Sequence, residues 1–109
     1  MQPSFDLFFV SSNYHKYKEA QKILHSFGIY LGFFKYDLEE IQSTSLKKIA
    51  SKKAQQAFQK YKKPIIVEDD GLFIDSLNGF PGPYSSYVFK TIGNKGILQL
   101  LKQNRKAKF

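Results

Sequence analysis

Short apolar runs alternate with helical periodicities along the first half of the chain. Phe5–Val10 is apolar and rich in Phe, which predicts a buried strand that ends at Ser11, Ser12 and Asn13. A helix is expected next, with Asn13 as its N-cap and Gly28 as its stop. Apolar residues recur there at spacings of three and four, so the inner face of the helix is predicted to be Tyr17, Ala20, Leu24 and Phe27.

The alternation of strand and helix continues through the middle of the chain. Ile29–Asp37 predicts a second strand, and Asp37–Ser45 a polar connection. Ser45 is placed to cap a second helix that ends before Pro64, and Pro64–Val67 follows as a short β-branched strand. The inner face of the second helix is predicted to comprise Leu46, Ile49, Ala50, Ala54, Ala57, Phe58 and Tyr61.

The last third of the chain contains more turn signals. Leu72–Leu77 predicts a strand or tight loop, Asn78–Pro83 a rigid loop, and Asn94–Lys102 a third helix, before a basic tail over Gln103–Phe109. Alternating strands and helices are typical of layered α/β proteins. We therefore expect one α/β domain over residues 1–109, with a mixed sheet flanked by helices.

Composition narrows the class of protein. A hydrophobic fraction of 42% and an aromatic fraction of 17% exclude a disordered segment. No cysteine is present, which excludes disulfides and thiolate metal sites. No run approaches the ~18 apolar residues of a membrane span, so we expect a cytoplasmic protein without a membrane partner.

A net charge of +8 attracts anions, but solvated helix faces are the favoured explanation for the lysines, so charge alone decides little. The main cluster is Lys47, Lys48, Lys52, Lys53, Lys60, Lys62 and Lys63.

The first candidate site is the predicted strand-to-helix junction at Ser11–Lys16. The N-terminus of a helix favours anions through its free N–H groups and its dipole. Asn13 and Lys16 add a donor and a positive charge suited to phosphate oxygens. The alternative is an ordinary N-cap followed by surface residues, because such junctions are common.

The second candidate site is acidic. Glu68, Asp69 and Asp70 directly follow a predicted strand, and crowded carboxylates are relieved when a cation such as Mg²⁺ binds between them. One of Glu39 and Glu40 is placed to supply a further carboxylate to the same ion. Solvated acidic loops are the alternative explanation for both clusters.

Four segments resemble the signatures of the inosine triphosphatase (Ham1) family. Ser11–Lys16 resembles its phosphate-binding signature, and Glu68–Leu72 its acidic motif. Leu77–Ser85 resembles its Leu-Asn-Gly-x-Pro-Gly-x-Tyr-Ser loop, and Thr91–Leu98 resembles the archaeal-type members. The resemblance implies an inosine triphosphatase-like (Maf/Ham1) fold, of which this chain would be the N-terminal half.

The resemblance also implies an activity, the Mg²⁺-dependent hydrolysis of non-standard purine nucleoside triphosphates (ITP, dITP, XTP) to the monophosphate and pyrophosphate. Glu40 and Asp69 would bind Mg²⁺, Asp69 would also act as general base, and Glu68 would support it. The residues implied to contact the substrate and its phosphates are Ser11, Ser12, Asn13, Tyr14, His15, Lys16, Lys53 and Asp70.

Two departures from the family pattern leave alternatives open. Asp70 stands where the family has Ser, so it would either weaken phosphate binding or serve as an extra metal ligand. The family's base-recognition loop and its late Lys and His-Arg elements are absent. The chain is then an active pyrophosphatase, a truncated member that binds Mg²⁺–nucleotide or polyphosphate without turnover, or, as the least favoured reading, a basic nucleic-acid-binding module. A homodimer is implied if the full family fold is completed.

Overall fold

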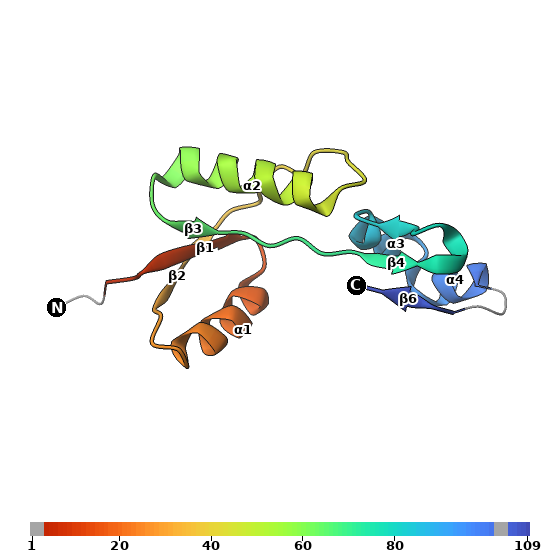
Figure 1. Cartoon of the computed structure of the whole chain (residues 1–109), viewed down its shortest axis with the longest axis horizontal. Helices are drawn as coiled ribbons and strands as arrows, with labels where there is room; N and C mark the ends of the chain where they lie inside the picture. The colour runs from red at the N-terminus through yellow and green to blue at the C-terminus, as the bar shows by residue number, and fades with distance from the viewer. Residues whose placement is uncertain (1–3, 102–104) are drawn as a thin grey trace. The chain divides into compact units, whose positions relative to one another are not determined.

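The computed structural model describes residues 4–101 and 105–109 (Figure 1). The chain divides into two compact units, Met1–Ile41 with Lys47–Glu68, and Gln42–Leu46 with Asp69–Phe109. Each unit has its own sheet and its own hydrophobic core. The α/β class is thus confirmed, whereas one domain over residues 1–109 stays a prediction. Within the described ranges, no helix is both long and apolar enough to span a bilayer.

The first unit is built from five elements that the sequence pattern predicts. In chain order they are β1 (Leu7–Ser11), α1 (Tyr14–His25), β2 (Leu31–Lys35), α2 (Leu46–Tyr61) and β3 (Ile65–Ile66). The strands pair in the order β2-β1-β3, and both pairings are parallel. The carboxyl ends of the three strands therefore meet at one edge of the sheet, where α/β proteins bind their ligands.

The side-chain alternation of β1 explains the layers of this unit. Phe9 packs with Tyr17 of α1 on one face, while its neighbour Val10 packs with Ala57 of α2 on the other. Figure 1 shows α1 and α2 on opposite faces of the sheet. The result is a three-layer arrangement with an apolar core on each side.

Helix α1 begins where the sequence indicates, and its last helical residue, His25, comes shortly before the predicted stop. The Asn13 side chain accepts a hydrogen bond from the Lys16 N–H, which caps the first turn. At the other end, Gly28 has a left-handed φ of 76° and donates to the His25 carbonyl. Gly28 is thus confirmed as the stop. The inner-face prediction is wrong for Phe27, which is 75% exposed because it lies beyond the last helical residue.

Helix α2 starts directly after Ser45, as predicted, and buries a narrow stripe of residues. Ile49, Lys53 and Ala57 are buried at spacings of four. The inner-face prediction is wrong for Phe58, which is 52% exposed because its helical position is about 100° from that of Ala57. The other predicted inner-face residues are half-buried: Leu46, Ala50, Ala54 and Tyr61.

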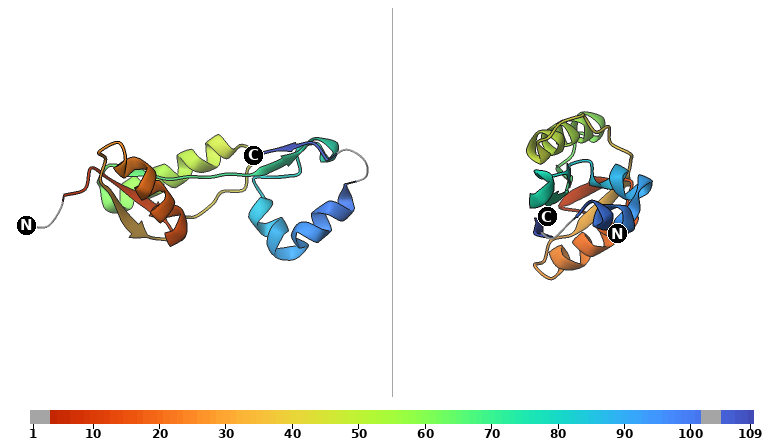
Figure 2. Two further views of the ribbon diagram at one scale, coloured as in Figure 1. Left: turned by 90° about the horizontal axis from the view of Figure 1, so that it is seen from below. Right: turned by 90° about the vertical axis from the view of Figure 1, so that its right-hand side faces the viewer.

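The second unit packs a small antiparallel sheet against two helices. Its elements are β4 (Leu72–Ile74), the 3-10 helix η1 (Asp75–Leu77), β5 (Pro81–Gly82), α3 (Ser85–Thr91), α4 (Gly93–Leu100) and β6 (Ala107–Lys108). The strands pair in the order β5-β4-β6. Figure 2 shows both helices on the same face of this sheet, where Ile74, Val88 and Ile97 form the core.

Three elements of this unit are not predicted by the sequence pattern: β5, which lies within the segment predicted as a rigid loop, α3 and β6. Only Val88 of α3 is buried, so no apolar stripe marks that helix. Both residues of β6 are exposed, and the strand exists through its pairing with β4. Helix α4 confirms the predicted third helix from Gly93 onward. The predicted end of that helix at Lys102, and the start of the predicted tail at Gln103, lie outside the described residues.

The rigid loop predicted over Asn78–Pro83 has a structural explanation. Asn78 and Gly79 adopt left-handed φ values of 55° and 88°, and the Phe80–Pro81 peptide is cis. The Ser85 hydroxyl accepts from the Leu72 N–H at 2.6 Å and donates to the Gly82 carbonyl. This hydroxyl therefore joins the end of the loop to β4 and β5.

Replacing Ser85 by Ala is expected to lower the free energy of unfolding by about 1–3 kcal/mol. The substitution leaves one backbone donor and one backbone acceptor of the sheet without their partner. Urea unfolding followed by circular dichroism measures the loss. Ser86→Ala is the matched control, because Ser86 is exposed and neighbours Ser85 on the same helix. Equal losses in the two variants would contradict the assigned role of Ser85.

Candidate functional site

The first candidate segment forms an ordered turn between β1 and α1. The Asn13 N–H donates to the Ser11 hydroxyl oxygen at 3.0 Å, and the Asn13 carboxamide oxygen accepts from the Lys16 N–H at 3.1 Å. Ser12 and Asn13 are exposed. The first N–H groups of a helix have no partner within the helix and point out of its N-terminus. This exposed turn therefore has the chemistry of an anion-binding site.

Aromatic packing holds the start of α1 against the sheet. The Tyr14 ring lies edge-on to Phe33, with centroids 5.7 Å apart, and His15 lies next to Tyr14. Behind them, the Tyr17 hydroxyl donates to the Leu31 carbonyl at 3.0 Å. Burial, with a smaller contribution from Tyr14, raises the pKa of Tyr17. Tyr14 and His15 remain exposed at the mouth of the turn.

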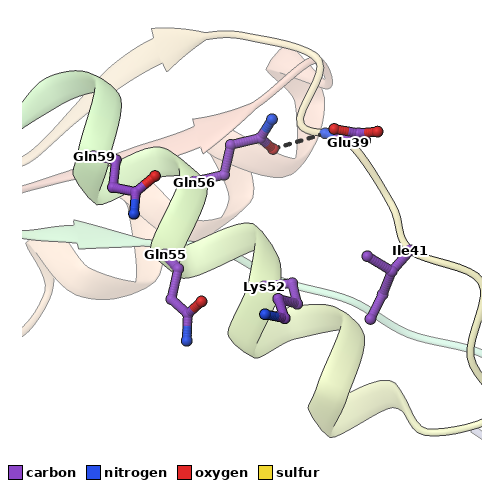
Figure 3. A pocket seen from close by; sticks show the side chains of 6 residues that line it. All are labelled: Glu39, Ile41, Lys52, Gln55, Gln56 and Gln59. Carbon is purple, nitrogen blue, oxygen red and sulfur yellow. Dashed lines mark hydrogen bonds between the residues drawn. The ribbon is translucent and has the colours of Figure 1, made fainter.

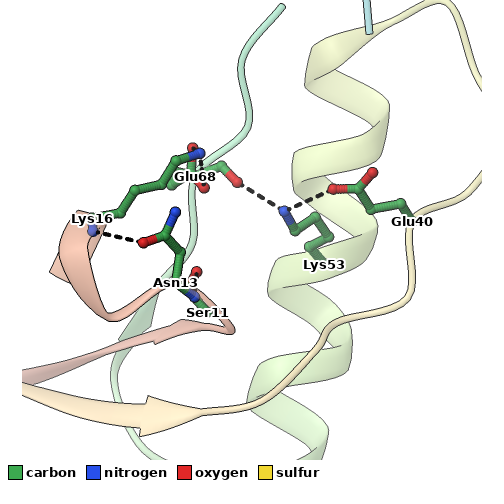
Figure 4. Close-up of polar contacts among 6 residues, drawn as sticks. All are labelled: Ser11, Asn13, Lys16, Glu40, Lys53 and Glu68. Atoms are coloured by element: carbon green, nitrogen blue, oxygen red, sulfur yellow. Dashed lines mark hydrogen bonds and ion pairs between the residues drawn. The ribbon is translucent and has the colours of Figure 1, made fainter. Parts of the chain in front are cut away.

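Lys16 forms an ion pair that joins α1 to the end of β3. Its ammonium donates to both carboxylate oxygens of Glu68, at 2.9 and 3.0 Å (Figure 4). Both side chains are partly exposed. A charge-assisted pair with two oxygens at these distances is stronger than an ordinary surface contact.

Lys53 is the second cation at this edge of the sheet and is only 9% exposed. Its ammonium donates to the backbone carbonyl of Glu68 at 2.9 Å and to the Glu40 carboxylate at 3.4 Å (Figure 4). A buried ammonium is stable only when such partners replace its water. Helix α2 is thereby connected both to the chain after β3 and to the loop after β2.

The structure therefore brings together four charged side chains that are far apart in the sequence. Lys16, Glu40, Lys53 and Glu68 come from four segments of the first unit, and their formal charges cancel. Two ammonium groups match phosphate oxygens, and two carboxylates match a divalent cation. Polyphosphate carrying such a cation is the ligand class that suits both halves of the set.

The remaining predicted acidic residues follow Glu68 directly in the chain. Asp69 is half-buried and Asp70 is exposed, and both belong to the second unit. Within residues 4–101 and 105–109, no three His, Asp or Glu side chains form a ready metal-binding group. The candidate donors are nevertheless carboxylate oxygens, and Mg²⁺ is usually held by one or two carboxylates together with substrate phosphates.

Gln56 is a residue that the sequence analysis does not single out. Its side-chain oxygen accepts from the Glu39 N–H at 2.8 Å, which attaches the loop carrying Glu40 to α2. The sequence feature by which Gln56 could have been found is its position three residues after Lys53, on the same side of α2. The Glu39 backbone, not its carboxylate, makes this contact.

A separate hollow of about 310 Å³ lies beside α2 (Figure 3). Its lining residues are Glu39, Ile41, Lys52, Gln55, Gln56 and Gln59. None of the four charged residues described above lines it. The hollow is therefore distinct from the candidate site.

The fold defines an α/β protein, and the charged set gives it a candidate site for an anionic ligand. The model of the Ham1 family matches residues 7–109, and the chain belongs to this family.

Individual relatives agree with this assignment. The chain is 52% identical over 103 residues to the dITP/XTP pyrophosphatase of Methanopyrus kandleri, covering 93% of this chain and 55% of that protein. It is 42% identical over 106 residues to the dITP/XTP pyrophosphatase of Ignicoccus hospitalis, covering 94% and 56%. The chain thus spans about half the length of the curated relatives it matches.

A solved structure shows the same fold. The nucleoside-triphosphatase/dITP/XTP pyrophosphatase of Mycobacterium abscessus matches with a TM-score of 0.62 at 26% identity. The match covers 81% of this chain and 49% of that one. The inosine triphosphatase-like fold expected from the sequence is therefore confirmed.

Proposed function

We propose that this chain carries the phosphate- and metal-binding part of a nucleoside triphosphate pyrophosphatase that acts on ITP, dITP and XTP. The observation that supports it best is the charged set Lys16, Glu40, Lys53 and Glu68, found at the strand ends of a Ham1 family member. The relatives named dITP/XTP pyrophosphatase suggest the substrate class. The products would be the nucleoside monophosphate and pyrophosphate.

In this proposal the lysines bind the phosphates. The turn Ser11–Lys16 cradles phosphate oxygens with backbone N–H groups and with the Asn13 and Lys16 side chains. Lys16 and Lys53 stabilise the charge that develops on the leaving pyrophosphate. Tyr14 and His15 belong to this turn and are exposed, so both would contact the substrate.

The carboxylates serve the metal and the attacking water. Glu40 and Asp69 would hold Mg²⁺, since their oxygens are ligands of the kind that this ion prefers. When bound, Mg²⁺ would neutralise part of the negative charge of the phosphates. The Asp69 carboxylate would accept the proton of the water that attacks the α-phosphorus, while the bond from this phosphorus to the bridging oxygen breaks and pyrophosphate leaves. Glu68 supports Asp69 from the preceding position, where Lys53 holds the Glu68 carbonyl.

The direct test is the release of pyrophosphate from ITP, dITP and XTP by the purified chain, with ATP and GTP for comparison. We expect release with Mg²⁺ that is lost in excess EDTA, and weaker release from ATP and GTP. Circular dichroism confirms that the protein tested is folded. Equal rates for all five nucleotides would contradict the substrate assignment.

A second candidate function is supported by the charged set alone, because its lysines and carboxylates suit the binding of phosphate and a cation whether or not a reaction follows. In this case the chain binds Mg²⁺–nucleotide or polyphosphate without turnover. Calorimetry with ITP and Mg²⁺ would then show binding, while the pyrophosphate assay detects no product. Absence of both binding and product would contradict the two proposals together.

Replacing Asp70 by Ser is expected to tighten triphosphate binding roughly threefold to tenfold, because it removes an exposed carboxylate that repels phosphate. Calorimetry with Mg²⁺–ITP measures the change. Asp75→Asn is the control, because Asp75 is an exposed carboxylate of the second unit outside the proposed site. Weaker binding of Asp70→Ser would instead indicate that Asp70 is an extra metal ligand.

Three further expectations concern the domain, the assembly and the location of the protein. We expect one folded domain over residues 1–109, a homodimer where the full family fold is complete, and a cytoplasmic location. Size-exclusion chromatography with light scattering measures the mass in solution and tests the dimer. Limited proteolysis tests the single domain, because one cooperative domain resists cleavage along its whole length until it unfolds.

A further inference from the structure

Both lysines proposed to bind phosphate already hold carboxylate partners in this structure. Lys16 donates to both oxygens of Glu68, and Lys53 donates to Glu40 (Figure 4). An incoming phosphate must therefore compete with a carboxylate for each ammonium. The two pairs are not equivalent, because the Lys16–Glu68 distances are 2.9 and 3.0 Å while the Lys53–Glu40 distance is 3.4 Å.

Competition of this kind penalises an anion that arrives without a cation. If bare polyphosphate takes Lys16, the Glu68 carboxylate loses its partner and is left beside a polyanion. A divalent cation that arrives with the phosphates offers the displaced carboxylates an opposite charge. Glu40, a proposed ligand of that cation, then regains an opposite charge directly, and Glu68 regains one through the cation held by its neighbour Asp69.

We propose that the Lys16–Glu68 pair, assisted by Lys53–Glu40, makes this site selective for polyphosphate ligands that carry a divalent cation. Glu68 is thus a specificity-determining residue that weakens the binding of metal-free polyphosphate. The inference rests on the proposed function, because it takes Lys16 and Lys53 as the phosphate-binding groups. It extends that function by explaining why the four charged side chains of the site carry no net charge.

Contact geometry supports Glu68 as the main determinant. Lys16 contacts Glu68 at 2.9 and 3.0 Å, whereas Lys53 contacts Glu40 at 3.4 Å, and the Glu68 carboxylate is less exposed than that of Glu40, at 33% against 56%. Glu68 also pairs through two oxygens, which adds directional preference to the charge. The Lys53–Glu40 contact is longer and Glu40 is more exposed, so phosphate displaces Glu40 from its lysine more easily.

The test measures the binding of inorganic tripolyphosphate by calorimetry, with Mg²⁺ and with EDTA, for the unmodified chain and for Glu68→Gln. The amide keeps the shape of the side chain but removes its charge. We expect Glu68→Gln to bind metal-free tripolyphosphate about threefold to tenfold more tightly than the unmodified chain. The ratio of affinities with and without Mg²⁺ should fall by a similar factor. Thermal unfolding confirms that each variant is folded.

Two further variants separate the ion pair from a general change in charge. Glu39→Gln is the matched control, because it removes an exposed carboxylate from the same loop as Glu40, and Glu39 lines the hollow on α2 instead. We expect it to change metal-free binding less than twofold. In Lys16→Met, adding Glu68→Gln should have little further effect, because Glu68 then no longer competes with phosphate for the Lys16 ammonium.

The outcomes distinguish this inference from the proposed function. If the unmodified chain binds no tripolyphosphate even with Mg²⁺, the phosphate site itself is refuted. If it binds, and Glu68→Gln leaves the Mg²⁺ ratio unchanged or matches Glu39→Gln, the selectivity assigned to Glu68 is overturned while the phosphate site stands. An effect of Glu68→Gln that persists in full on the Lys16→Met background would also overturn it.

Discussion

Replacing Asp69 by Asn is expected to lower the turnover number for ITP by roughly 10²–10⁴-fold, the range typical of losing a general base. This corresponds to about 3–5 kcal/mol of transition-state stabilisation. The amide keeps nearly the same shape but cannot accept the proton of the attacking water. It also removes one of the two carboxylates proposed to hold Mg²⁺, so the requirement for Mg²⁺ should rise.

The Asp69→Asn experiment needs a readout that separates chemistry from binding. Steady-state pyrophosphate release gives the turnover number, and calorimetry with Mg²⁺–ITP gives the affinity. Asp37→Asn is the matched control, because Asp37 is an exposed carboxylate in the loop before α2 and has no role in the proposed site. Normal turnover by Asp69→Asn would rule out this residue as the base.

The fold of the first unit could be predicted because its signals are local. The apolar run around Phe9 and Val10, the cap at Asn13 and the stop at Gly28 each act within a few residues. The second unit depends more on contacts between distant segments. Strand β6 pairs with β4 across more than thirty residues of sequence. Its two residues are exposed and show no hydrophobic alternation that would predict a strand.

The candidate site could be predicted in its residue types but not in its pairings. The sequence indicates Lys16 and Glu68 separately, one for phosphate and one beside the metal. Their ion pair joins residues 52 positions apart, which only the folded sheet brings together. The burial of Lys53 has the same origin, because a lysine on the inner stripe of α2 requires the Glu68 carbonyl as a partner.

Replacing Lys53 by Met is expected to lower kcat/KM for ITP by about 100-fold, a typical loss for one charged donor at a developing negative charge. The substitution removes the ammonium that is proposed to contact the phosphates. It also releases the Glu68 carbonyl, and with it the peptide bond that leads directly to Asp69. Both losses act on the reaction, so we expect kcat to fall together with substrate affinity.

Stability should respond much less than activity to Lys53→Met. Methionine fills most of the buried volume, and an uncharged side chain removes the cost of keeping an ammonium away from water. The Glu68 carbonyl loses its hydrogen-bond donor, which should lower the free energy of unfolding by about 1–2 kcal/mol. Urea unfolding measures it, and Lys52→Met, the adjacent exposed lysine of α2, is the matched control for both measurements. A purely structural Lys53 would give the reverse pattern, with a large loss of stability and an activity that falls only as the folded fraction falls.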